Sequence, residues 1–173
     1  RAATRRKAGG AARKLMFVDA RKAHLNPVCT ETVYILLPEE AGAGPGKCGI
    51  VNYWLYGCRQ AAQAWEEHYA EKLESVGFVR GKASPVVFKH KDKDIACVVH
   101  GDDFIVLGMY WELDWFWKTI QERFECKKRG RLGPEEGDGK SIRILNRIVT
   151  WTEEGIQYEG DQRHVEIAMK EMG

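Results

Sequence analysis

One ten-residue segment constrains the fold of this chain more than any other. It reads VVHGDDFIVL and spans residues 98–107. Short apolar runs rich in β-branched residues stand on both sides of its polar centre, as in buried strands, and the pair Gly101–Asp102 suits a tight turn. The segment therefore predicts a strand–turn–strand hairpin with Asp102 and Asp103 at its tip. These carboxylates either satisfy the geometry of a solvated turn or belong to a site, and the motif alone does not decide between the two.

The rest of the chain alternates between strand and helix patterns. The first half predicts strands at 14–20 and 32–38, a Gly- and Ala-rich loop at 39–49, and a helix from 57 to 78. The next part predicts two or three strands within 85–108, a helix at 110–124, a strand at 124–128 and an acidic glycine loop at 133–139. The chain then predicts a hairpin at 142–160 that turns at Glu154–Gly155, and a last helix that begins near Asp161 as its N-cap and runs to Gly173. This order predicts an α+β fold that contains the split βαβ (ferredoxin-like) arrangement, an antiparallel sheet with helices on one face.

In such a sheet the end of the first strand lies beside the tip of the central hairpin. Asp19 would then approach Asp102 and Asp103, although it precedes Asp102 by 83 positions. Three carboxylates at one edge repel one another unless a divalent cation lies between them, and hard cations such as Mg²⁺ prefer oxygen ligands. Two such ions can clamp a phosphoryl group and activate the hydroxyl that attacks it.

Composition limits the class of protein. The 173 residues suffice for one domain with a substantial core, and 30% charged with 44% hydrophobic residues is ordinary for a soluble globular protein. We expect no membrane partner, because the sequence holds neither a run long enough for a membrane span nor a charged-then-apolar leader. The five scattered cysteines argue against a disulfide framework or a zinc site. These features favour an intracellular, cytoplasmic protein.

Charge is distributed unevenly along the chain. Residues 1–14 carry six basic side chains and no acidic one, which leaves 21 basic and 25 acidic residues in 15–173, a net charge of −4. We expect 1–14 to be a basic, flexible tail and 15–173 to be the folded domain. The tail either contacts a polyanion or is a solvated arm without a function.

From about Lys14 to Gly173 the chain resembles the reverse transcriptase of copia-like retrotransposon polyproteins. FVDARKAHLNP (17–27) resembles the first catalytic motif of that family, and WLYGCRQAAQAW (54–65) resembles its L-Y-G-L-K-Q-x-P-R-x-W signature. VVHGDDFIVLG (98–108) stands where the family has Y-V-D-D-x-x-x-x-G. RFECKKRGRLG followed by IRILNRIV resembles the next segment, which includes the strand pair that grips the primer terminus. Four blocks in the family's order form a much more specific signal than any single motif.

The resemblance implies a polymerase palm domain that acts as an RNA-directed DNA polymerase. Asp19, Asp102 and Asp103 would be its catalytic residues and would hold two Mg²⁺ ions, which Mn²⁺ can replace. The substrates would be deoxynucleoside triphosphates and an RNA or DNA template with its primer, whose 3′-hydroxyl attacks the α-phosphate. Further binding positions implied by the family are the Ala20 carbonyl as an oxygen ligand, His24 beside the nucleotide sugar, Gly57 and Gln60 along the template and incoming base, and His100 near the primer.

Several departures from the family pattern favour a second interpretation. His100 and Gly101 replace a Tyr-Val pair, His24 replaces a bulky aromatic residue, and Ala62–Gln63 replace Pro-Arg. We expect residues 1–14 to be all that represents the family's fingers region, and we expect no ribonuclease H domain, so this fragment should be inactive, or nearly so, alone. The alternative is a degenerate, catalytically inactive retroelement remnant with at most weak nucleic-acid binding. A viral RNA-dependent RNA polymerase would fit the GDD tip, but it predicts an S-G-x-x-x-T segment where the chain has LYGCRQAAQAW.

Overall fold

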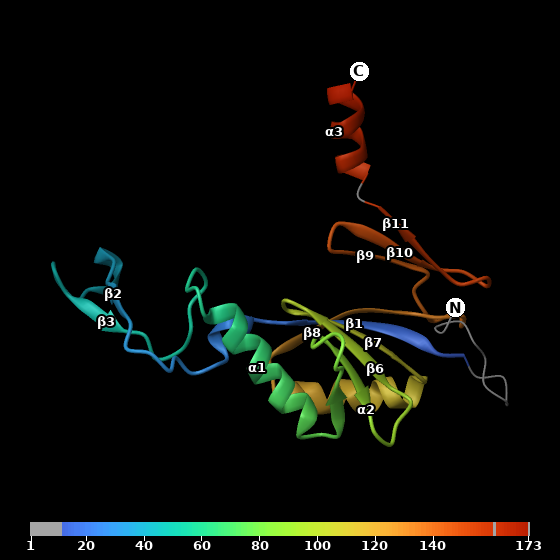
Figure 1. Cartoon of the computed structure of the whole chain (residues 1–173), viewed down its shortest axis with the longest axis horizontal. Helices are drawn as coiled ribbons and strands as arrows, with labels where there is room; N and C mark the ends of the chain where they lie inside the picture. Colours follow the sequence, from blue (N-terminus) through green and yellow to red (C-terminus); the bar gives the residue numbers. More distant parts are fainter. Residues whose placement is uncertain (1–11, 161, 173) are drawn as a thin grey trace.

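A computed structural model describes residues 12–160 and 162–172. Within them the chain forms an α+β fold whose sheets are antiparallel (Figure 1). The strands are β1 (Lys14–Ala20), β2 (Tyr34–Leu36), β3 (Cys48–Ile50), β4 (Phe78–Arg80), β5 (Val87–His90), β6 (Ala96–His100), β7 (Asp103–Gly108), β8 (Cys126–Leu132), β9 (Ser141–Ile144), β10 (Arg147–Trp151) and β11 (Ile156–Glu159). The helices are α1 (Ala61–Glu74), α2 (Tyr110–Gln121) and α3 (Gln162–Met172), with short 3₁₀ turns η1 (Ala23–Leu25) and η2 (Glu39–Ala41).

The main sheet has the strand order β4-β5-β6-β7-β1-β8, and each pair of neighbours is antiparallel. Strands β1 and β6 therefore run parallel to each other with β7 between them, which is the split βαβ order that the sequence predicts. Strand β1 lies inside the sheet although both of its partners, β7 and β8, follow it by more than 80 residues. The end of β1 is thereby fixed against the start of β7.

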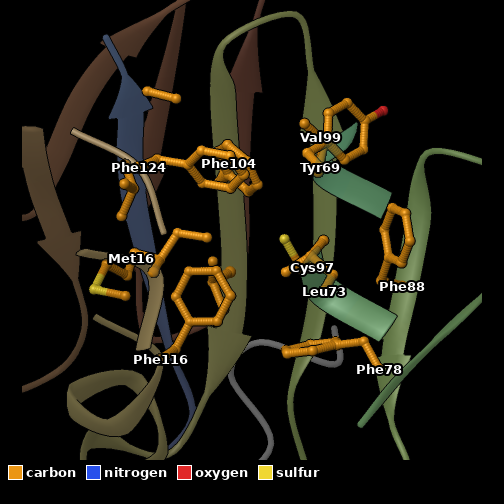
Figure 2. Close-up of a cluster of buried hydrophobic side chains, with 14 of the residues drawn as sticks. Met16, Tyr69, Leu73, Phe78, Phe88, Cys97, Val99, Phe104, Phe116 and Phe124 are labelled. Carbon is orange, nitrogen blue, oxygen red and sulfur yellow. The ribbon is translucent and has the colours of Figure 1, made fainter. Parts of the chain in front are cut away.

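Helices α1 and α2 pack on the same face of this sheet. Alternate residues of β1, β6 and β7 point toward the helices, as the period of two in a strand requires. Figure 2 shows the resulting core, in which aromatic side chains of the helices meet those of the strands. Its central members include Met16, Val18, Trp65, Tyr69, Leu73, Phe88, Cys97, Val99, Phe104, Val106, Leu113, Phe116, Ile120 and Phe124.

The opposite face of the sheet is covered only in part. A second cluster of buried residues, Phe17, Leu132, Ile144 and Val149, joins β1 and β8 to the meander β9–β10–β11. This meander and α3 lie to one side of the main sheet (Figure 1). None of the helices among the described residues is long and apolar enough to cross a membrane.

The structure corrects several predicted boundaries. Helix α1 covers Ala61–Glu74 rather than 57–78, because Gly57 and Gly77 both have positive φ values (94° and 97°) that no helical residue adopts. Strand β2 is shorter than predicted, and it pairs with β3, whose first two residues fall in the segment predicted as a loop. Lys14 belongs to β1, so the folded part begins before residue 15. Asp161, the predicted N-cap of the last helix, lies outside the described residues.

The predicted hairpin at 142–160 is a three-stranded meander with an additional turn at Leu145–Asn146. Both residues have left-handed backbone conformations, with φ values of 49° and 58°, as a type I′ turn requires. Asparagine tolerates this conformation, whereas a leucine side chain is strained in it. The sequence contains no glycine here, which is why the turn is not apparent from composition.

We predict that Leu145→Asn raises the free energy of unfolding by about 1 kcal/mol, because it relieves the strain of a left-handed leucine. Urea denaturation measures the change. Leu36→Asn is the matched control, because Leu36 is an exposed leucine outside the set of residues with positive φ. Equal effects in the two variants would show that the loss of an exposed apolar side chain, and not backbone strain, sets the stability.

Candidate metal centre

Two of the three predicted carboxylates form a cross-strand pair. In the β1–β7 ladder, Asp19 lies directly opposite Asp103. Met16 and Val18 on β1, and Phe104 on β7, point toward the helices. Side chains alternate along a strand, so Asp19 and Asp103 point to the other, partly open face. The core pattern of the two strands thus places both carboxylates together.

The third carboxylate belongs to the hairpin turn. His100 pairs with Asp103, which leaves Gly101 and Asp102 as a two-residue turn between β6 and β7. Gly101 has a φ of 59°, and glycine at the first central position is typical of a type II′ turn. The sequence prediction of a tight hairpin is confirmed, with Asp102 in the turn and Asp103 as the first residue of β7.

Two hydrogen bonds hold this turn from outside the hairpin. The Ala20 backbone N–H donates to the Asp102 carbonyl over 2.8 Å. The indole N–H of Trp65, on α1, donates to the Gly101 carbonyl over 2.7 Å. The turn is therefore attached both to the end of β1 and to the helical layer. Sequence periodicity places Trp65 in the core but does not reveal this bond.

One carboxylate oxygen from each of Asp19, Asp102 and Asp103 lies within 4.8 Å of the others. Asp103 is buried, Asp19 is half-buried and Asp102 is exposed. Burial raises the pKa of Asp103, and the charges of Asp102 and Asp19 raise it further, while Arg129 and His100 oppose the shift. The donor set consists of hard oxygens that converge on one point, so it fits a divalent cation such as Mg²⁺.

A cation that sequence reasoning missed lies beside these carboxylates. Arg129, on β8, places one guanidinium nitrogen 3.4 Å from Asp103 Oδ1 and the other 3.9 Å from Asp19 Oδ1. Its side chain is 41% exposed. The positive charge of Arg129 thus partly balances the negative charges of the three carboxylates.

The structure places the other predicted binding residues as follows. Ala20 and His100 adjoin the carboxylates through the Ala20–Asp102 hydrogen bond and the His100–Asp103 pair. His24 lies in η1 with its ring centroid 4.5 Å from that of Tyr56, and its Nδ1 is buried without a hydrogen-bond partner. Gly57 precedes α1, and Gln60 donates to Glu31 over 3.3 Å. None of these contacts of His24 and Gln60 involves the three carboxylates.

Gln60 borders a cavity of about 390 Å³. Its lining includes three carboxylates, those of Glu31, Glu67 and Glu71, together with Trp54. Such a lining repels the phosphates of a nucleic acid. The cavity therefore does not provide the positive surface that a template backbone needs.

No protein-family model matches the sequence, and no solved structure matches the chain.

Proposed function

We propose that this chain is the palm domain of an RNA-directed DNA polymerase, the reverse transcriptase of a copia-like retrotransposon. The observation that carries the proposal is the convergence of Asp19 with Asp102 and Asp103 on the open face of the sheet. The four motif blocks in the sequence and the split βαβ strand order both support it. A solvated turn would require no third carboxylate from a distant strand.

In this proposal Asp19, Asp102 and Asp103 hold two Mg²⁺ ions. When bound, such ions lower the pKa of an attacking hydroxyl and stabilise the charge that develops on a phosphoryl group. The protein supplies three carboxylates on an ordered main chain. The β1–β7 ladder positions Asp19 and Asp103, and the hydrogen bonds from Ala20 and Trp65 to the hairpin turn position Asp102. No side-chain nucleophile is needed, because the primer 3′-hydroxyl is the attacking group.

The same face of the sheet would receive the primer terminus. His100 is exposed and points to this face, opposite the side on which Val99 is buried. Its position across from Asp103 suits a hydrogen bond to the primer or to its phosphates. Imidazole is a poor ligand for Mg²⁺, so we assign His100 a positioning role and not a metal-binding one.

Two observations favour the second candidate, a catalytically inactive remnant. Arg129 lies against the carboxylates, where its charge disfavours a second cation. The cavity beside Gln60 carries Glu31, Glu67 and Glu71 where the family resemblance places the template. A remnant with these features would bind nucleic acid weakly, if at all, and would not extend a primer.

Single-turnover primer extension with the full chain in excess tests the proposal. The substrate is an RNA template with a labelled DNA primer, with and without Mg²⁺. We expect slow, Mg²⁺-dependent addition of a deoxynucleotide that falls by at least about 100-fold in Asp19→Asn, because that variant removes a metal ligand. Glu125→Gln is the control, since Glu125 is an exposed carboxylate that pairs with Arg21 outside the site.

The outcomes separate the two candidates. Extension that is independent of Mg²⁺, or equal in Asp19→Asn and the unmodified chain, would contradict the polymerase proposal. Binding of the template–primer without any extension would support the inactive remnant.

A further inference from the structure

Arg129 reaches the carboxylates because of an irregularity in β8. Along the β1–β8 ladder, Phe17 pairs with Gly130 but its neighbour Val18 pairs with Lys128. Arg129 is therefore an extra residue without a partner on β1, which defines a β-bulge. Bulges redirect side chains and occur often beside functional sites.

The contacts on either side of the bulge show how it redirects Arg129. Lys128 Nζ lies 4.8 Å from the ring centroid of Trp117, and Arg131 pairs with Asp114. Trp117 and Asp114 are both on α2, so Lys128 and Arg131 face the helices although they are three positions apart. In a regular strand, Arg129 would share the face of Arg131. The bulge instead turns it toward Asp19 and Asp103.

We propose that Arg129 is a built-in counter-cation that competes with divalent metal for the carboxylates of Asp19, Asp102 and Asp103. A guanidinium remains charged at all relevant pH values. It therefore reduces the negative potential that attracts a metal ion, and it repels the ion directly. The inference rests on the metal centre of the proposed function, and it concerns how the three carboxylates become accessible to a metal ion.

The geometry suits a group that leaves when metal arrives. Both contacts of Arg129 are long for charge-assisted hydrogen bonds, at 3.4 and 3.9 Å. The side chain is 41% exposed, so it can move into solvent without disturbing the core. The main chain of the three aspartates, by contrast, is held by the β1–β7 ladder and by the hydrogen bonds from Ala20 and Trp65 to the turn. Arg129 can therefore leave without a change in the main chain that carries the three carboxylates.

Titration of the full chain with Mn²⁺, followed by electron paramagnetic resonance of free Mn²⁺, tests the competition. We expect Arg129→Met to bind Mn²⁺ about fivefold more tightly than the unmodified chain, as for the loss of one partly exposed ion pair. Arg129→Lys retains the charge and should stay within about twofold of the unmodified chain. Arg131→Met is the matched control, because it makes the same change on the same strand toward the opposite face.

Each outcome has a distinct meaning. Equal or weaker Mn²⁺ binding by Arg129→Met, with binding still lost in Asp103→Asn, would overturn the competition but leave the metal centre intact. Mn²⁺ binding that survives in Asp103→Asn, or no binding by any variant, would overturn the metal centre itself. Should Arg129→Met not fold, the side-chain nitrogen resonance of Arg129 in the unmodified chain decides: it should shift as Mg²⁺ is added, and an unchanged signal at saturation would refute displacement.

Discussion

Trp65→Ala is expected to lower the free energy of unfolding by about 3–5 kcal/mol, the range for removal of a buried aromatic side chain. Trp65 is 2% exposed, and its ring packs edge-on against Tyr69, Phe104 and Phe124, with centroid distances of 5.0–6.4 Å. Tyr69 is on α1, Phe104 is on β7 and Phe124 follows the end of α2. Urea denaturation followed by circular dichroism measures the loss.

Trp65→Phe separates packing from the hydrogen bond to the turn. Phenylalanine retains most of the aromatic contact but cannot donate to the Gly101 carbonyl. We expect a loss of about 1–2 kcal/mol and faster hydrogen exchange of the Ala20 amide, which bonds the adjacent Asp102 carbonyl. Trp117→Phe is the control, because Trp117 is half-buried on α2 and contacts Lys128 rather than the turn. Unchanged exchange at Ala20 in Trp65→Phe would show that α1 does not hold the turn.

Asp138→Asn is expected to lower the free energy of unfolding by about 3 kcal/mol at pH 7, because it removes the buried carboxylate beside the Lys14 ammonium and leaves only the exposed carboxylate of Glu135. Lys14 Nζ lies 2.7 Å from Asp138 Oδ2 and also pairs with Glu135. The side chains of Lys14 and Asp138 are only 8% and 7% exposed. This cluster fastens the start of β1 to the loop that follows β8.

The pH dependence of stability follows from the same cluster. Burial would raise the pKa of Asp138, but hydrogen bonds with Glu135 and Lys14 outweigh it and lower that pKa below its usual 3.8. The stabilisation is therefore present above pH 3.8 and is lost as the pH falls through the folded-state pKa. Burial would lower the pKa of Lys14, yet its hydrogen bonds to Asp138 and Glu135 raise it above 10.5, so stability is also lost as the pH rises beyond that value.

The difference in unfolding free energy between the unmodified chain and Asp138→Asn should shrink below pH 3.8. Chemical denaturation across pH 2–9 measures it. Glu125→Gln breaks the exposed pair with Arg21 and should leave stability almost unchanged at every pH. A difference that stays constant through acid pH would mean that Asp138 acts by shape and not by charge.

Residues whose conformation is set locally could be predicted from the sequence. The turn at Gly101–Asp102 follows from the preference of glycine for positive φ, and the flanking strands follow from their β-branched residues. The approach of Asp19 to Asp103 followed from strand order, because a split βαβ arrangement leaves few places for the first strand.

Features that depend on register or on weak local signals were missed. Alternation along CKKRGRL places Arg129 on the face of Arg131, and only the ladder with β1 reveals the bulge that separates them. The turn at Leu145–Asn146 lacks the glycine that usually marks a two-residue hairpin turn. Strand β3 has only three residues, one of them glycine, so it shows no pattern. The hydrogen bond from the Trp65 indole to the Gly101 carbonyl joins residues 36 positions apart, and helical periodicity does not predict such a contact.

The ribbon of β2 and β3 extends away from the main sheet (Figure 1), and Leu36 within it is 84% exposed. The covalent path from Asp19 to Asp102 runs through this ribbon, whereas the contacts between them run through the β1–β7 ladder. A cut between Gly42 and Gly46, where glycines have positive φ and no neighbour close to a Cβ, would divide the chain into two fragments. One fragment would carry Asp19, and the other would carry Asp102 and Asp103. The metal centre would then exist only when the fragments associate. Metal binding would therefore report the insertion of β1 between β7 and β8, and the chain is suited to fragment complementation.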